Sequence, residues 1–206
     1  MTLTELYSSI DRHLQEDSIP SVYLNSIYDT PLFQQHPFHM LYRLKQTEQS
    51  LLHHPEGNVW NHTMLVVDEA ATVKEKSANP RVFLWAALLH DIGKPDTTRR
   101  RKGKITAYDH DKVGAVLAKQ FLQECNENSK FIEEVTQLIR YHMQILFVAK
   151  SLPFADIQGM AQNTNIQEVA LLGLCDRLGR GNTNRQKEEE TIRMFLERCH
   201  SVLSKF

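Results

Sequence analysis

The sequence predicts an all-α fold, a bundle of helices with one short β-hairpin or loop after a central buried helix. Apolar residues recur at helical spacing along most of the chain, whereas strand-like residues are confined to one short segment. The eight-residue run at 82–89 is apolar on every side, which is typical of a helix enclosed by others. No repeat, low-complexity tract or Pro/Gly/Ser-rich linker divides the 206 residues, so we expect a single domain.

The first half of the chain contains two apolar stripes at helical spacing. The first consists of Leu3, Leu6, Tyr7, Ile10 and Leu14, and the second, after Gly57, of Val59, Val66, Ala70 and Val73. Each stripe predicts an amphipathic helix. The segments 18–31 and 151–165 show no clear period, and we expect short helices and turns there.

The buried helix at 82–89 is followed by signals that end a helix. Gly93 can adopt the left-handed closing conformation, and Pro95 cannot continue a helix. The next residues, TTRRRKGKITAY at 97–108, place Thr and Ile around a Lys-Gly pair, which predicts the hairpin or loop. Helical spacing then returns, and we predict helices over 110–122, 131–148, 166–178 and 185–203.

Composition limits the classes of partner and compartment. The 24 Lys and Arg balance 25 Asp and Glu to a net charge of -1, so no overall field attracts nucleic acid or anionic lipid. No apolar run approaches the roughly 20 residues of a membrane span, and the amino terminus lacks a secretory signal. The three cysteines, Cys125, Cys175 and Cys199, form no C-x-x-C pair, so we expect a reducing, cytoplasmic location.

Several imidazoles and carboxylates fall on the inward faces of different predicted helices. These candidate metal ligands are His62, the adjacent pair His90 and Asp91, His110, His142 and Asp176. A buried, unpaired carboxylate is costly, so Asp176 needs a cation or donors nearby, and Arg140 is an alternative partner for it. Mixed nitrogen and oxygen ligands without a thiolate favour one or two divalent ions of Mn, Fe, Co, Ni, Zn or Mg.

Three linked motifs carry a resemblance to a known family. The segments HHPEGNVWNHT at 53–63, ALLHDIGKP at 87–95 and GKITAYDHDKVGA at 103–115 resemble the HD superfamily of metal-dependent phosphohydrolases. They are most similar to the HD domain of bacterial CCA-adding tRNA nucleotidyltransferases. The resemblance implies an HD core over 51–181, with an N-terminal helical extension over 1–50 and a C-terminal helix over 182–206. The first 50 residues lack the Gly-Ser or Gly-Gly turn and paired acids of a nucleotidyltransferase domain, so we do not expect CCA addition.

The resemblance also implies a ligand arrangement. One ion would take His62, His90, Asp91 and Asp176, and a second would share Asp91 and take His110 and His142, as in two-metal HD enzymes. Such a pair of ions activates a water and stabilises both the attacking and the leaving oxygen of a phosphoester. Asp91 and Lys94 are therefore the expected catalytic residues. Lys94 would neutralise the charge that develops on the phosphoryl oxygens. Alternatively, Lys94 is only a cation that stabilises the end of a helix.

Basic residues near these ligands are candidate substrate contacts. Five positive charges fall in the window 99–104: Arg99, Arg100, Arg101, Lys102 and Lys104. They could bind the phosphates of a nucleotide or RNA. Alternatively, the segment is only a solvated loop, because it has no interleaved aromatic residues on which bases could stack. Arg177 and Arg180 flank the last ligand and are further phosphate candidates.

The expected function is hydrolysis of nucleotide phosphomonoesters or phosphodiesters, with 2',3'-cyclic phosphates implied by the CCA-type resemblance. The expected partner is a phosphorylated small molecule or nucleotide, or an RNA end. Two alternatives stay open: a dinucleoside polyphosphate or cyclic-dinucleotide hydrolase, and a non-catalytic module that binds nucleic acid or a protein partner.

Overall fold

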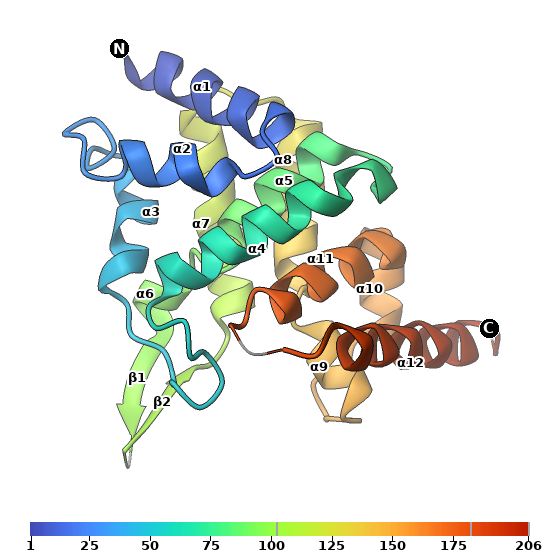
Figure 1. Cartoon of the computed structure of the whole chain (residues 1–206). Helices are drawn as coiled ribbons and strands as arrows, with labels where there is room; N and C mark the ends of the chain where they lie inside the picture. Colours follow the sequence, from blue (N-terminus) through green and yellow to red (C-terminus); the bar gives the residue numbers. More distant parts are fainter. Residues whose placement is uncertain (102, 182, 206) are drawn as a thin grey trace.

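The computed structural model describes residues 1–101, 103–181 and 183–205, and its architecture is all-α with one small two-stranded sheet (Figure 1). The first half contains α1 (Leu3–Glu16), α2 (Pro20–Ile27), α3 (His39–Tyr42), α4 (Val59–Val73) and α5 (Pro80–Leu89), with 3-10 turns at Arg43–Gln46 and Lys74–Lys76. The second half contains α6 (Lys94–Thr97), β1 (Thr98–Arg101), β2 (Lys104–Ala107), α7 (His110–Glu124), α8 (Ser129–Tyr141), α9 (Gln144–Ala149), α10 (Ile157–Asn163), α11 (Ile166–Leu178) and α12 (Arg185–Leu203). The predicted fold class is confirmed.

Helix α5 forms the centre of the bundle. Every residue from 82 to 89 is buried, and α5 contacts α1, α4, α8 and α11. Asn79 caps its amino end and Pro80 occupies its first turn, where a missing N–H is harmless. Trp85 stacks on Tyr7 of α1 with ring centroids 4.6 Å apart, and its indole N–H donates to Asp11. The amino-terminal helix is thus part of the same core.

The predicted role of Gly93 as a left-handed helix terminator is wrong. Its φ is -80°, within the right-handed region, and Lys94 and Pro95 begin α6 directly after it. Glycine is required here because a Cβ would lie 2.6 Å from the backbone nitrogen of Gly114 and closer still to the carbonyl oxygen of His110. The absence of a side chain lets α7 pack tightly against the segment that follows α5.

The predicted helix over 131–148 is two helices. Helix α8 ends at Tyr141, His142 is its C-cap, and α9 begins at Gln144. Apolar spacing continues across this break, because Leu138, Ile139 and Ile145 all reach the core. The interruption places His142 at a helix end, where its side chain is turned into the bundle.

The predicted hairpin is present as an antiparallel pair that projects from the bundle (Figure 1). Arg99 pairs with Thr106 and Arg101 with Lys104, so these residues share one face, while Arg100 lies on the other face opposite Ile105. Lys102, which the sequence grouped with these residues, lies outside the described residues.

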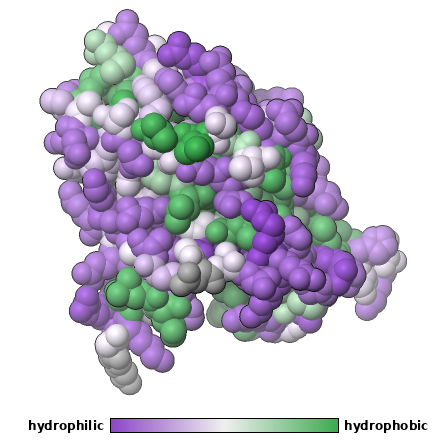
Figure 2. Space-filling model, viewed as in Figure 1, coloured by the Kyte–Doolittle hydropathy of each residue, from purple (hydrophilic) through white to green (hydrophobic). Residues whose placement is uncertain are grey.

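Helix α12 contacts α9 and α11 and extends away from the rest of the bundle (Figure 1). Arg198 donates to the carbonyl oxygens of Val148 and Ala149 at the end of α9, which satisfies groups that a helix leaves unpaired. The visible face of the molecule is largely hydrophilic, with separate hydrophobic patches (Figure 2). Among the described residues, no helix combines the length and hydropathy needed to span a membrane.

Candidate metal centre

The structure brings the six predicted metal ligands together inside the bundle. They come from five helices or helix ends: His62 from α4, His90 and Asp91 from the end of α5, His110 from the start of α7, His142 from the end of α8 and Asp176 from α11. None is more than 8% exposed. The helices that pack their apolar faces together to form the core therefore also place these polar groups inside it.

Three of the histidines are held by the backbone in the same way. Each donates Nδ1–H to the carbonyl oxygen three residues earlier: His90 to Ala87 at 2.9 Å, His110 to Ala107 at 2.7 Å, and His142 to Ile139 at 2.6 Å. A histidine with its proton on Nδ1 has its free lone pair on Nε2. This hydrogen bond therefore fixes both the ring orientation and the tautomer typical of a metal ligand.

The Nε2 atoms converge on the carboxylates and on one another. Nε2 of His62 lies 3.0 Å from Oδ1 of Asp176, and Nε2 of His90 lies 3.2 Å from Oδ2 of Asp91. Nε2 of His110 lies 3.2 Å from Nε2 of His142 and 3.5 Å from Oδ1 of Asp91. Two lone pairs at 3.2 Å repel each other unless a proton or a cation lies between them.

These residues therefore form buried His/Asp clusters that could hold a metal ion. Ligand atoms of His62, His90 and Asp91 lie within 4.8 Å of one another, and so do those of Asp91, His110 and His142. Within the described part of the chain, Nε2 of His90 has no hydrogen-bond partner, and Oδ2 of Asp91 accepts no hydrogen bond although it forms an ion pair with Lys94. A buried polar atom without a partner is costly, and a divalent cation would satisfy Nε2 of His90 and bind the carboxylate of Asp91 as well.

Two basic side chains border the clusters. Nζ of Lys94 lies 2.7 Å from Oδ2 of Asp91 and donates to Oε1 of Gln49 at 2.5 Å. Arg180 contacts both carboxylate oxygens of Asp176, at 3.0 and 3.2 Å, while its Nε has no partner among the described residues. The alternative pairing of Asp176 with Arg140 is not present, because Arg140 binds Asp111 instead.

The charges of the cluster follow from these contacts. Burial alone would raise the pKa of Asp91, but the neighbouring His90 and Lys94 hold that pKa well below its ordinary value. Arg180 and His62 do the same for the pKa of Asp176. Burial, together with the charges of His110 and His90, lowers the pKa of His142 to about 3, so its imidazole is neutral near neutral pH. The centre thus combines ionised carboxylates with a free imidazole lone pair.

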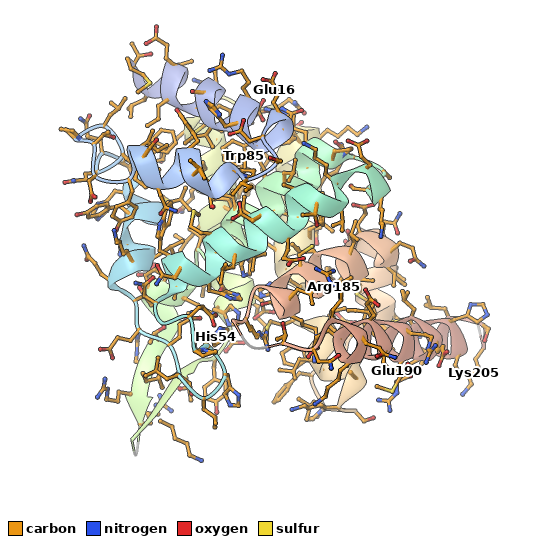
Figure 3. The ribbon with its side chains drawn as sticks, in the orientation of Figure 1. Glu16, His54, Trp85, Arg185, Glu190 and Lys205 are labelled. Carbon is orange, nitrogen blue, oxygen red and sulfur yellow. The ribbon has the colours of Figure 1, made fainter. Side chains whose placement is uncertain are left out.

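Three further residues of the site were not predicted from the sequence. Gln49, His54 and Glu56 lie in the loop before α4, where no periodicity indicates which side chains point inward. Oε1 of Glu56 lies 2.8 Å from Nδ1 of His54 and 2.9 Å from Nδ1 of His62, so these three could also hold an ion. Figure 3 labels His54 in this loop. Only the motif at 53–63 hinted at this loop, through His54 and Glu56.

The predicted substrate contacts are divided between two places. Arg99, Arg100, Arg101 and Lys104 are exposed on the hairpin, and Arg100 is paired with Glu48 at 2.5 Å. Arg177 points away from the cluster and binds Glu188 of α12, an ion pair that holds α11 to α12. Of the predicted phosphate contacts that the structure describes, Arg180 is the one that lies in the buried cluster.

The HD domain family matches residues 59–181, more than half of the chain. The Multifunctional CCA protein of Actinobacillus pleuropneumoniae is 44% identical over 57 residues, which are 28% of this chain and 13% of that protein. The A-adding tRNA nucleotidyltransferase of Deinococcus radiodurans is 38% identical over 61 residues, 29% of this chain and 14% of that protein. The Bifunctional uridylyltransferase/uridylyl-removing enzyme of Hydrogenovibrio crunogenus is 28% identical over 140 residues, 65% of this chain and 14% of that enzyme. The matched regions are thus a small part of each of these relatives.

Proposed function

The chain belongs to the HD domain family, and from this membership and the buried centre we propose that it is a metal-dependent phosphohydrolase. Its proposed substrates are phosphomonoesters or phosphodiesters of nucleotides. The observation that carries the proposal is the orientation of the histidines, whose Nδ1 atoms are held by acceptors while their Nε2 atoms surround Asp91. Facing lone pairs and buried polar atoms without partners reduce the stability of the fold, so a purely structural cluster would not be expected to contain them.

The proposed ligands fall into two sets that share Asp91. The first set is His62, His90, Asp91 and Asp176, and the second is Asp91, His110 and His142. These nitrogen and oxygen donors suit Mn, Fe, Co, Ni, Zn or Mg. Divalent ions held there would supply Lewis-acid polarisation of a phosphoryl oxygen and activation of a water for attack.

The protein's own cations would act on the substrate phosphate. Lys94 is held in place by Asp91 and Gln49, and its ammonium retains one N–H donor for a phosphoryl oxygen. Arg180 is anchored by Asp176 and keeps an unpartnered Nε–H. Donors that are positioned before the substrate arrives stabilise developing negative charge without reorganising during the reaction.

The exposed hairpin supports a substrate larger than a single phosphate. Arg99, Arg101 and Lys104 share one face, so the hairpin presents a row of positive charge within a chain of net charge -1. One relative is named as a CCA protein, a second as an A-adding tRNA nucleotidyltransferase, and a third in part as a uridylyl-removing enzyme. We therefore propose nucleotide or RNA-end substrates, including 2',3'-cyclic phosphates.

Three expectations from the sequence stay predictions: Arg177 as a phosphate contact, the boundaries at 50 and 181, and the cytoplasmic location.

The test is elemental analysis of protein purified without chelator, followed by assays on a panel of phosphoesters. We expect divalent metal in the wild type and metal-dependent hydrolysis of bis(p-nitrophenyl) phosphate. Asp91→Ala should abolish that hydrolysis while the helical circular dichroism stays intact, because the fold is stabilised by the apolar core. The matched control Asp29→Ala changes an exposed carboxylate in the turn after α2 and should keep the wild-type rate. Retention of most of the activity in Asp91→Ala would overturn the proposal.

A further inference from the structure

Glu56 is a buried carboxylate just before the part of the chain that matches the HD domain family, residues 59–181. Its side chain is only 4% exposed, although it lies in a loop. Gly57, with a φ of 102°, turns the chain directly after Glu56. The side-chain amide of Asn61 in α4 donates to the backbone carbonyl oxygen of Glu56 at 3.0 Å. The loop therefore has a defined local structure that directs this carboxylate inward.

The carboxylate of Glu56 contacts His62 on the side away from the cluster. Oε1 lies 2.9 Å from Nδ1 of His62, while Nε2 of the same ring faces Asp176 at 3.0 Å and Asp91 at 3.8 Å. The carbonyl oxygen of Gly179 is a second acceptor for Nδ1, at the longer distance of 3.3 Å. Glu56 is thus the nearer acceptor, and it is charged.

His62 differs in this respect from the other three histidines of the cluster. Those rings donate Nδ1–H to neutral backbone carbonyls alone, whereas Nδ1 of His62 has both a backbone carbonyl, that of Gly179, and the carboxylate of Glu56 beside it. A carboxylate in the same position both orients the ring and increases the donor strength of Nε2 towards a cation. His62 also comes from α4, in which it lies mid-helix, so no helix-end carbonyl three residues earlier is free to hold it.

We propose that Glu56 is a positioning residue that orients His62 and strengthens its binding of a divalent cation, an inference that rests on the proposed metal centre. Its second oxygen accepts from the backbone N–H of Gly181 at 3.3 Å, next to Arg180, which anchors Asp176. Glu56 therefore helps to position two proposed ligands relative to each other. It contacts His62 directly, and it acts on Asp176 through the segment 179–181. His54, at 2.8 Å from the same Oε1, fixes the carboxylate from the solvent side.

The test compares Glu56→Gln with the wild type. Glutamine has the same shape and retains an acceptor oxygen, so the substitution removes the charge and leaves the packing. Metal-free protein is titrated with Mn²⁺ alone by calorimetry, and the unfolding temperature of the metal-free protein is measured separately. Glu189→Gln is the matched control, because Glu189 is an exposed carboxylate on α12 and is not a member of the cluster.

We expect Glu56→Gln to weaken the binding of one Mn²⁺ by about 10-fold to 100-fold, with unchanged stoichiometry and little change in the metal-free unfolding temperature. Glu189→Gln should bind as the wild type does. An affinity for Mn²⁺ within threefold of wild type would overturn the inference. Loss of one bound ion, with the other ions bound as before, would also overturn it, because Glu56 would then be a direct ligand together with His54.

A second variant covers failure of the first to fold. Glu56→Asp keeps the charge but shortens the side chain, so the carboxylate no longer reaches Nδ1 of His62, and the Mn²⁺ affinity should again fall. Wild-type affinity in this variant would overturn the inference. If the wild type itself binds no Mn²⁺, Co²⁺ or Zn²⁺, both the proposed function and the role of Glu56 are wrong. If the wild type and the variants bind the metal equally, only the proposed role of Glu56 is wrong.

Discussion

Replacing Gly93 by alanine tests how the fold positions the metal centre. An added Cβ would lie 2.6 Å from the nitrogen and 2.9 Å from the Cα of Gly114, whereas ordinary contact begins at 3.4 Å. The segment after α5 and helix α7 would have to separate by at least about 0.8 Å, and by more at the closer carbonyl oxygen of His110, and backbone atoms on both sides limit the adjustment. Overpacking of this kind costs about 3 kcal/mol, which lowers Tm by about 6–12 °C in a chain of this size.

The assay is thermal unfolding followed by circular dichroism at 222 nm, with Asn substitutions as the discriminating variants. If the close contact is the reason for glycine, Gly93→Asn should be less stable than Gly93→Ala, because the larger side chain adds to the clash. Gly103 is the matched control, since its φ is 74° and, apart from its chain neighbours, no described residue has an atom within 4 Å of an added Cβ. There Asn should be tolerated better than Ala, because Asn adopts left-handed conformations more readily. A Gly93→Ala variant within about 0.5 kcal/mol of wild type would refute the reasoning.

Three further predictions concern charge and metal content. Glu127 accepts from Tyr7 and pairs with Arg81, which lowers the pKa of Glu127 below its ordinary 4.5 against the effect of burial. Glu127→Gln should therefore cost about 1–2 kcal/mol of unfolding free energy at pH 7, and denaturant titrations should show the difference disappearing as the pH falls through that lowered pKa. His110→Ala should reduce the metal content from near two ions per chain towards one, and elemental analysis giving the same content in both proteins would contradict a second ion site. Replacing the arginines at 99–101 with Ser should raise KM for an RNA end and weaken its salt dependence, whereas an equal loss on bis(p-nitrophenyl) phosphate would indicate a structural role for the hairpin.

The sequence by itself determined the fold class and most of the helices. Helical periodicity is a local property, so the stripe at Leu6, Ile10 and Leu14 and the apolar run before His90 identify buried faces without knowledge of the partners. The same periodicity placed His62 and Asp176 on inward faces. Their convergence was predictable because polar groups on several buried faces must meet one another or a cation.

Only the tertiary structure decided which groups meet. Gly93 carries every sequence signal of a helix terminator, yet its conformation is ordinary and its constraint comes from α7, which no local pattern encodes. Arg177 and Arg180 are one turn apart, and the structure directs the first to Glu188 and the second to Asp176. Glu56 lies in an aperiodic loop, so its contact with His62 depends on how that loop folds back over α4. Periodicity gives the direction of a side chain relative to its own helix, whereas the identity of its partner depends on the packing of elements that are distant in the sequence.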